Sequence, residues 1–252
     1  MENAPDIHGK ILEGISVLIT GGTTGIGRAT ALLLAEHGAK ILFFGRHEKE
    51  LNDVTEEFTK NALEDKVMGV IADVSRKDDI DFIFQQADGF LGQLNVLVNN
   101  ASLGYKSIME GNYDDWQYIL QVNLLGYMAC THEAVKRMKD KNGGHIINIG
   151  SMSADIREKG SSVYVATKAG IQGFSEALRK EVNPLGIKVT LIEPGAVGTN
   201  MQPGSSEDHR EKTKEMEMLK AEDIAQCVLY VLTQPKRCDV VEVKIRPHLQ
   251  LI

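Results

Sequence analysis

The chain has 252 residues, 42% of them hydrophobic, with 24 Gly, 3 Cys and a formal net charge of −7. This composition excludes an intrinsically disordered chain, a disulfide-rich scaffold and a collagen, and the mildly acidic balance argues against a nucleic-acid-binding protein. A chain of this length can form one domain with a large core.

Short apolar segments rich in β-branched residues alternate along the chain with longer segments of helical period. We expect strands at residues 15–20, 40–44, 67–72, 96–99, 145–149, 188–192 and 240–245, and helices at residues 27–37, 48–61, 77–91, 116–139, 164–183 and 221–232. Near-continuous apolar strands indicate a sheet covered on both faces, and strand-helix alternation implies parallel pairing with right-handed crossovers. The expected fold is therefore α/β: a doubly wound (Rossmann-type), seven-stranded parallel sheet in a single domain, residues 1–252.

One connection, residues 198–220, is polar and long. Connections beyond about 12–15 residues are usually lids, binding loops or disordered segments. We expect this segment to be a substrate lid within the domain.

Features of location and metal binding are few. The N-terminus has neither the basic start nor the apolar stretch of a signal peptide, and no run reaches the ~18 apolar residues of a membrane span, so a cytoplasmic protein is expected. Cys130, Cys227 and Cys238 show no CxxC spacing and the histidines show no HExxH pattern. Reduced thiols and no metal site are expected.

A glycine-rich segment, TGGTTGIG at residues 20–27, lies between the first strand and the first helix. Glycines there let the backbone approach a pyrophosphate, which the helix N-terminus stabilises, although a simple strand-helix turn would also use glycine. No GxxxxGK[ST] pattern is present, which disfavours a triphosphate-hydrolysing loop. A dinucleotide is the favoured ligand.

The end of the second strand bears on which dinucleotide binds. A carboxylate there would bind the ribose 2′-hydroxyl, whereas an Arg accommodates a 2′-phosphate. The sequence has Gly45 and Arg46, with no carboxylate before Glu48. NADP(H) is favoured over NAD(H), the alternative being that Arg46 is a solvated charge at a helix start.

Tyr164 and Lys168 are four residues apart, so they share a helix face, and Ser151 follows the strand at 145–149. A Tyr–Lys pair at this spacing also arises by chance, but strand ends are where ligands bind in open α/β sheets. These residues are therefore candidates for catalysis.

Together these segments resemble the short-chain dehydrogenase/reductase family in its ordinary form of about 250 residues. The family's TGxxxGIG loop corresponds to residues 20–27, its NNAG turn to NNAS at residues 99–102, and its PGxxxT turn to residues 194–199. Its asparagine, serine and YxxxK pair correspond to Asn123, Ser151, Tyr164 and Lys168.

The resemblance implies a carbonyl/alcohol interconversion by hydride transfer. Tyr164 would be the general acid/base, Lys168 would lower the phenol pKa and bond the nicotinamide ribose, and Ser151 would hold the substrate oxygen. Asn123 would hold a water of a proton relay. The cofactor-binding residues would be Gly21, Thr23, Thr24, Gly25, Ile26, Gly27, Arg46, Asp73, Val74, Asn100, Ala101, Ser102, Tyr164, Lys168, Pro194, Gly195, Val197 and Thr199.

Several of these roles have alternatives. Asn123 lies among apolar residues, where its side chain could simply bond a backbone carbonyl, and Asp73 could cap a helix. Ser153 competes with Ser151 for the serine role, but only Ser151 stands 13 residues before Tyr164. Ser102 replaces the last glycine of the NNAG turn, which would cost stability if that position needs a positive φ.

The substrate pocket is expected from Leu103, Tyr105, residues 153–160 and the lid around Met201. Arg157 is a candidate for binding a substrate carboxylate or else a solvated charge. The helices at 116–139 and 164–183, with Ala166, Ala169, Gly170 and Gly173 among their small residues, are expected to form a dimer face in a homotetramer, or a homodimer, as in the family.

The expected function is an NADP(H)-dependent oxidoreductase acting on a small-molecule carbonyl or alcohol, without nucleic-acid or membrane partners. The C-terminal sequence resembles the branch of NADP-dependent reductases that act on 3-hydroxy acids such as serine and on related small aldehydes, and it suggests a tail that packs on a partner subunit. The alternatives are a reductase for 3-oxoacyl groups on acyl carrier protein and a non-catalytic NADP-binding regulator.

Overall fold

The structure is a computed structural model that describes residues 10–141, 143–202 and 204–250. Residues 1–9, in the N-terminal segment that lacks signal-peptide features, lie outside the described residues. Residues 251–252, at the end of the predicted tail, also lie outside them.

All seven strands form one parallel sheet in the order β3-β2-β1-β4-β5-β6-β7. The order reverses between β1 and β4, which is where doubly wound sheets bind ligands at the carboxyl ends of their strands. The predicted fold is confirmed, with strand ends displaced by at most two residues. The strands are β1 (Ser16–Thr20), β2 (Lys40–Gly45), β3 (Val67–Ile71), β4 (Val96–Asn99), β5 (Gly144–Ile149), β6 (Ile187–Pro194) and β7 (Glu242–Ile245).

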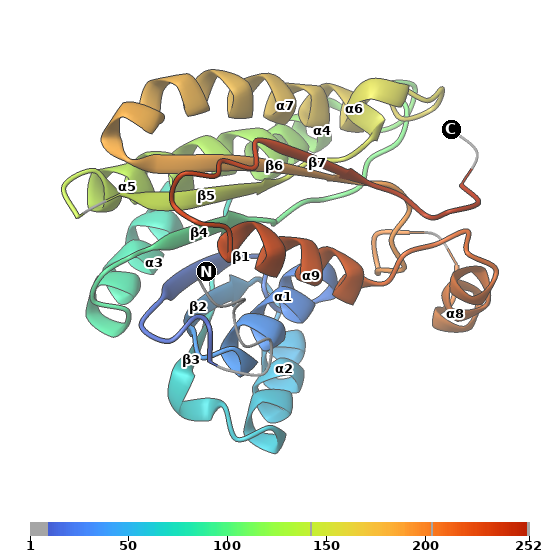
Figure 1. The fold of residues 1–252 in the computed structure, drawn as a ribbon. Coiled ribbons are helices and arrows are strands. Elements are labelled where there is room, and N and C mark those ends of the chain that lie inside the picture. Colours follow the sequence, from blue (N-terminus) through green and yellow to red (C-terminus); the bar gives the residue numbers. More distant parts are fainter. Residues whose placement is uncertain (1–9, 142, 203, 251–252) are drawn as a thin grey trace.

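Helices cover both faces of the sheet (Figure 1). One core cluster lies under α1 (Gly25–Glu36), α2 (Glu48–Lys60) and α9 (Ala221–Leu232). The other lies under α3 (Lys77–Phe90), α5 (Gly126–Met138) and α7 (Ser162–Val182). Because both faces are buried, the central strands are apolar throughout, as the sequence pattern indicated.

The helix predicted at residues 116–139 is interrupted. It begins as α4 (Tyr113–Leu120), passes through the π-helical turn η2 (Gln121–Leu125) and continues as α5. It begins three residues earlier than expected because Asn112 and Asp115 form a capping box. A π-turn adds one residue to the helix and often marks a functional site, and this one contains Asn123.

Short helical segments were absent from the prediction because a few residues carry too little periodicity to be recognised. The predicted lid contains α8 (Ser206–Lys214), which starts at a capping box of Ser205 and Asp208 and lies at one end of the molecule (Figure 1). The two ends of the predicted lid are joined by a parallel β-bridge between Val197 and Leu219. The other short segments are α6 (Ser153–Ile156), η1 (Glu64–Lys66) and η3 (Asn183–Leu185).

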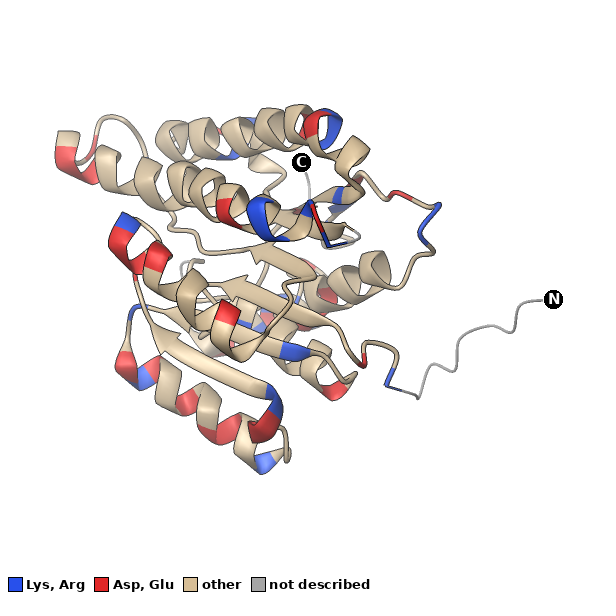
Figure 2. Ribbon diagram, turned by 90° about the vertical axis from the view of Figure 1, so that its left-hand side faces the viewer, with Lys and Arg blue, Asp and Glu red and all other residues tan. Residues whose placement is uncertain are grey.

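Charged residues of both signs lie close together on the helices (Figure 2). No helix in the described part of the chain is both long and apolar enough to cross a bilayer. Within residues 10–250, apart from 142 and 203, no group of three or more His, Cys, Asp or Glu is placed to hold a metal ion. The described cysteines are all free thiols.

Candidate active site

The glycine loop is closely packed, and glycine is required at its turning points. Gly21 has a φ of +66°, and a Cβ on Gly27 would lie 2.2 Å from the Gly21 carbonyl oxygen. A side chain at either position would therefore strain the turn or force β1 and α1 apart. Ile26, in the first turn of α1, packs against the core.

The end of β4 fixes this loop from the side. The Thr20 hydroxyl accepts hydrogen bonds from the backbone amides of Asn100 (2.9 Å) and Ala101 (2.8 Å). The Asn100 amide group donates to the carbonyl oxygens of Thr20 and Gly21, each at 3.0 Å. These contacts bring the glycine loop and the NNAS turn together across the sheet's switch point.

The N-terminus of α1 is suited to an anion. Thr24 is its N-cap residue but makes no side-chain capping bond, so the side chain of Thr24 does not occupy the first helical amides. Phosphate binds well at such a helix start, since the amides and the helix dipole both favour negative charge. Thr23 lies beside Gly45, where a Cβ would approach the Thr23 hydroxyl to 2.3 Å, so β2 ends close against the loop.

Arg46 follows β2 and is joined to Asp73, which follows β3, through a side chain that the sequence interpretation did not include. An Arg46 Nη1 donates to the Tyr118 hydroxyl, which donates to Asp73 Oδ2 at 2.9 Å. The guanidinium also lies 5.7 Å from the centre of the Tyr118 ring. Tyr118 thus connects the two residues predicted to contact the adenosine half of a dinucleotide.

Asp73 also supports the turn that follows β3. Its Oδ1 accepts from the Ser75 amide at 2.9 Å. Burial alone would raise the pKa of Asp73, but hydrogen bonds from Ser75 and Tyr118 and the charge of Arg46 keep it below its ordinary value. Asp73 therefore stabilises the turn after β3 but does not cap α3, whose N-cap residue is Arg76, and its second oxygen faces Tyr118. The following residue, Val74, is buried against Gly126 of α5.

Ser102 does not strain its turn, because it is not among the described residues with positive φ. Its hydroxyl is buried and has no hydrogen-bond partner among the described residues. Ser102 therefore offers a free donor and acceptor at the site where the resemblance expects a dinucleotide.

The turn after β6 approaches the glycine loop from the opposite side. The Gly195 amide donates to the Ile245 carbonyl at 2.8 Å, and the Pro194 carbonyl accepts from Met152 at 3.0 Å. The Thr199 amide donates to the Val197 carbonyl at 2.8 Å. The Thr199 methyl lies 3.1 Å from the Cβ position of Gly25. The predicted cofactor residues of the two turns are thus close together.

The three predicted catalytic residues meet at the carboxyl end of β5. The Ser151 side chain lies close enough to Tyr164 to lower the pKa of its phenol. Lys168 Nζ donates to the Ile149 carbonyl at 3.1 Å and lies 5.7 Å from the centre of the Tyr164 ring. Ser153 instead donates from its hydroxyl to Glu158 at 2.6 Å, so Ser151 is the serine that faces the tyrosine.

In the protein itself, burial rather than Lys168 decides the direction in which the pKa of Tyr164 moves. Burial raises the pKa of Tyr164, and so does the charge of Glu158, while hydrogen bonding with Ser151 opposes them. Burial also lowers the pKa of Lys168 to about 8, and only Glu193 counteracts it. Desolvation is therefore the largest influence on both groups, and it shifts each of them toward its neutral form.

Asn123 is fully buried and its side chain is used by the protein. Its Oδ1 accepts from the Leu103 amide and its Nδ2 donates to the Leu103 carbonyl, both at 2.8 Å. Nδ2 also donates to the Thr167 hydroxyl at 3.2 Å. The backbone-bonding alternative thus describes the side chain, which fixes the segment after β4 to α7.

The residues expected around the substrate are partly brought together. Met201 lies over Gly104, 3.2 Å from its Cβ position, so the start of the predicted lid reaches the segment of Leu103 and Tyr105. Arg157 is exposed, has a φ of +53° and donates from Nε to the Ala154 carbonyl at 3.2 Å. Nothing in these contacts aims Arg157 at Tyr164.

Comparison with known proteins agrees with this arrangement. The profile described as short chain dehydrogenase matches residues 16–210. The chain belongs to the short-chain dehydrogenase/reductase family. An uncharacterized oxidoreductase of Staphylococcus aureus (strain USA300) is 36% identical over 231 residues, which cover 91% of this chain and 96% of the relative. One from Staphylococcus epidermidis is 36% identical over 239 residues, 94% of this chain and 99% of the relative.

Solved structures of this family superpose closely. A short-chain dehydrogenase/reductase from Serratia marcescens has a TM-score of 0.83 at 28% identity, covering 95% of this chain and 99% of that chain. A 3-ketoacyl-(acyl-carrier-protein) reductase from Brucella melitensis, complexed with NADH, has a TM-score of 0.83 at 25% identity, covering 95% and 100%. The family uses nicotinamide cofactors, and the loop, the free α1 start and the Ser102 hydroxyl fit such a group.

The sequence did not predict the side chains that connect the predicted site residues to one another. Thr20 was included only as the first residue of the glycine motif and Tyr118 not at all, because their contacts join segments that are 80 and 45 residues apart. Glu193 did carry one: it is a carboxylate in the apolar strand VTLIEP, where a charge is costly unless it is paired.

Proposed function

We propose that the protein is an NADP(H)-dependent oxidoreductase that interconverts a carbonyl compound and a primary or secondary alcohol. The observation that carries the proposal is the meeting of Ser151, Tyr164 and Lys168 beside the glycine loop. A hydroxyl that can hold a substrate oxygen, a phenol that can move a proton and an ammonium group nearby are the groups that carbonyl reduction requires.

NADPH, when bound, supplies the hydride. The raised pKa of Tyr164 keeps its phenol protonated at neutral pH, so it can donate a proton to the developing alkoxide in reduction. Ser151 hydrogen-bonds the same oxygen, where negative charge develops. A charged Lys168 stabilises the phenolate that remains, and in alcohol oxidation Tyr164 acts as the base. Asn123 positions Lys168 by joining the Leu103 segment to α7.

The preference for NADP(H) rests on the carboxyl end of β2. Arg46 offers a planar cation there and no carboxylate precedes Glu48. Tyr118 supports the preference, because its hydroxyl and ring hold Arg46 beside Asp73. The Arg46 side chain therefore loses less freedom when it binds a phosphate.

The substrate that we propose is a small 3-hydroxy acid, aldehyde or ketone, covered by residues 198–220 acting as a lid. Met201 supports the lid, since it already lies over Gly104. Arg157 is the candidate for a substrate carboxylate. Its Nε donates to the backbone carbonyl of Ala154, which leaves the two terminal nitrogens of the guanidinium to bind an anion.

A second candidate is reduction of a 3-oxoacyl group carried on acyl carrier protein. The similarity to the Brucella melitensis reductase favours it. Such an enzyme would have to dock an acidic carrier, which the formal net charge of −7 does not favour.

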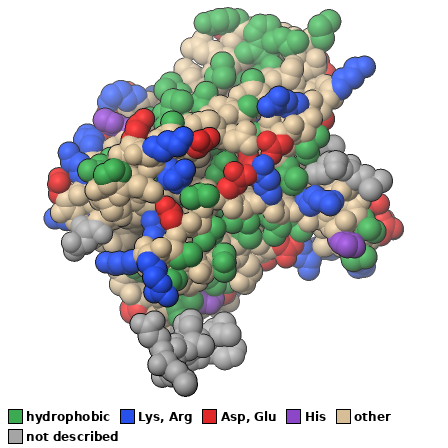
Figure 3. All heavy atoms as spheres, turned by 45° about the horizontal axis from the view of Figure 1, so that its top comes forward, with side chains coloured by type: hydrophobic (Ala, Val, Ile, Leu, Met, Phe, Trp, Pro, Cys, Tyr) green, Lys and Arg blue, Asp and Glu red, His purple; other side chains and the backbone are tan. Residues whose placement is uncertain are grey.

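We further propose a homotetramer or homodimer with the helices α4–α5 and α7 at an interface. Leu120, Leu125 and Met128 are exposed on these helices, and exposed hydrophobic side chains on a helix pair favour association. In the view over α6 and α7, hydrophobic and charged side chains are interspersed (Figure 3). Gly173 is open to solvent, whereas Gly170 packs on Leu124 of the same chain.

The test is a panel assay that follows NADPH oxidation. Small aldehydes, ketones, β-keto esters and a 3-oxoacyl thioester are supplied in reduction, and serine or another 3-hydroxy acid with NADP+ in oxidation. Turnover of small substrates supports the first function, and turnover of the thioester alone supports the second. Binding of NADPH without turnover of any substrate would favour a non-catalytic regulator.

A further inference from the structure

Glu193 is a buried carboxylate that no step of the proposed reaction uses. It is the residue before Pro194 at the end of β6, its side chain is fully buried, and neither carboxylate oxygen has a hydrogen-bond partner among the described residues. Burying a charge without hydrogen bonds costs several kcal/mol or more, so the group needs a compensating charge.

The surroundings place Glu193 under the catalytic serine. The Cβ position of Gly150 lies 3.1 Å from Glu193 Cγ and 3.4 Å from its Oε1. Gly150 directly precedes Ser151. It directly follows Ile149, whose carbonyl accepts from Lys168 and from the Tyr127 hydroxyl, each at 3.1 Å. Glu193 and Lys168 thus flank the same short piece of chain.

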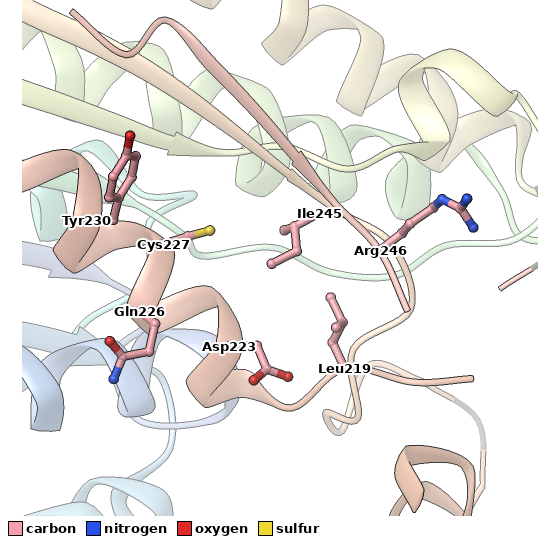
Figure 4. A pocket seen from close by; sticks show the side chains of 7 residues that line it. All are labelled: Leu219, Asp223, Gln226, Cys227, Tyr230, Ile245 and Arg246. Atoms are coloured by element: carbon pink, nitrogen blue, oxygen red, sulfur yellow. The ribbon is translucent and has the colours of Figure 1, made fainter. Parts of the chain in front are cut away.

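The other neighbouring cation is Lys244 of β7. Its Nζ lies 3.6 Å from Glu193 Oε2 and 2.9 Å from Glu242 Oε1, and it also pairs with Asp155 Oδ2. Ile245, the next residue, lines a groove of about 510 Å³ against α9 (Figure 4). Because successive strand residues point to opposite faces, Lys244 points to the other face, where α6 and α7 lie.

Asp155 connects this cation to the catalytic segment. It lies in α6, four residues after Ser151, and its Oδ1 accepts from Gln172 of α7 at 2.9 Å. The segment 151–156, which we call the Ser151 segment, is therefore joined by Lys244 to the sheet edge and by Gln172 to the helix that carries Lys168. Glu193 lies beneath these contacts.

We propose that Glu193 is a positioning residue of the active site: its buried carboxylate, anchored by Lys244 beneath the Ser151 segment, holds Lys168 in the charged form that the reaction needs. The inference rests on the proposed function, in which a charged Lys168 stabilises the Tyr164 phenolate. The charged groups that act on Glu193 are Lys244 and Glu242 from β7 and Asp155 from α6. Glu193 in turn acts on Lys168 from α7.

The electrostatics agree with this geometry. Burial raises the pKa of Glu193 to about 7, with Asp155 and Glu242 adding to the rise and Lys244 opposing it. Burial lowers the pKa of Lys168 to about 8, and Glu193 opposes that fall. The two groups are of opposite charge, so ionisation of Glu193 favours protonation of Lys168.

The direct test is a ¹³C NMR titration of lysine side chains in the full chain, with Lys168→Met to assign the Lys168 signal. Glu193→Gln removes the charge and keeps the shape. We expect its Lys168 midpoint at a pH about one unit lower than in the wild type, because one neighbouring opposite charge is lost. Glu193→Asp retains the charge and should restore most of the difference.

The pH dependence of kcat distinguishes this role from a purely structural one. In carbonyl reduction, kcat should begin to fall with rising pH at a lower pH in Glu193→Gln than in the wild type. In that alkaline range the loss of kcat relative to the wild type should be up to about tenfold larger than the loss at neutral pH. The matched control is Glu133→Gln, an ion-paired and partly buried carboxylate of α5, which should leave this pH dependence unchanged. If Glu193→Gln does not fold, Lys244→Met should move the Lys168 midpoint in the same direction.

An unchanged Lys168 midpoint in Glu193→Gln would overturn the inference, and so would an equal loss of kcat at every pH. The two proposals fail in different ways. A wild-type protein that turns over no substrate of the panel contradicts the proposed function, whereas the NMR titration needs no substrate and tests Glu193 alone.

Discussion

Two regions of the site hold their charges in opposite ways. At the ends of β2 and β3, the partly exposed Arg46, Tyr118 and Asp73 form a chain of hydrogen bonds. At the ends of β5 and β6, Lys168 and Glu193 are buried, and the carboxylate has no hydrogen bond among the described residues. The hydrogen bonds of the first region keep the pKa of Asp73 below its ordinary value, whereas burial in the second region shifts Lys168 and Glu193 toward their neutral forms.

The difference shows what each region can control. In water-exposed surroundings charge interactions are weak and depend on geometry, so the first region can select a ligand without changing a proton equilibrium. In buried surroundings desolvation and single charges move pKa values by units, so the second region can set a protonation state. We expect changes in the first to alter cofactor choice and changes in the second to alter rate and pH dependence.

The largest effect is expected from Tyr164→Phe in the buried region. It removes the proton that reduction requires, so kcat should fall by about 10²–10⁴-fold, while NADPH affinity stays near that of the wild type. Steady-state kinetics and fluorescence titration with NADPH measure the two quantities. Turnover near the wild-type rate would refute Tyr164 as the acid.

Arg46→Asp tests the exposed region. It removes a charge-assisted bond to the 2′-phosphate and adds a repulsive charge, so the ratio of kcat/KM for NADPH over NADH should fall by roughly 10–100-fold. Arg237→Asp makes the same charge change in an exposed residue after α9 and should leave the ratio unchanged. An unaltered preference in Arg46→Asp would contradict the assignment of NADP(H).

Tyr118→Phe tests whether Tyr118 acts on the cofactor through Arg46, because it removes one hydroxyl and keeps the ring. The loss of the bonds to Arg46 and Asp73 should raise KM for NADPH by about fivefold, with a smaller change for NADH and the same kcat. Tyr230→Phe in the groove of Figure 4 is the matched control. Equal changes for both cofactors would show that Tyr118 does not act through Arg46.

The smallest effect concerns stability against pH. Glu193 has its pKa raised from 4.5 to about 7, so the folded chain holds a proton that the unfolded chain has lost between these values. Its contribution is fully present below about pH 4.5 and is lost as the pH rises through about 7. The free energy of unfolding of the wild type should therefore fall relative to that of Glu193→Gln across this range.

Urea unfolding at a series of pH values measures this difference. Lys168 contributes a slope of the opposite sign only above about pH 8, where its lowered pKa lies, so the range below 7 isolates Glu193. Parallel curves for the two proteins would mean that Glu193 has the same pKa in the folded and unfolded chains.

Local chemistry in the sequence was enough to predict the seven strands, their parallel pairing and the glycine loop. The apolar strands and the strand-helix alternation leave few topologies, and glycines at a strand-helix junction have few uses. The order of motifs likewise predicted Ser151, Tyr164 and Lys168 as catalytic residues. Each of these signals depends on residues that are near one another in the chain.

The tertiary structure decided what depends on burial and on contacts between distant segments. The sequence places a lysine four residues after Tyr164, but only the packing of α7 on the sheet buries both groups, which raises the pKa of Tyr164 and lowers that of Lys168. Tyr118 contacts Arg46, which is 72 positions away in the chain. Lys244 of β7 pairs with Glu193 of β6. Solvent exclusion and the register of parallel strands are properties of the folded sheet, and they turn separate motif residues into one site.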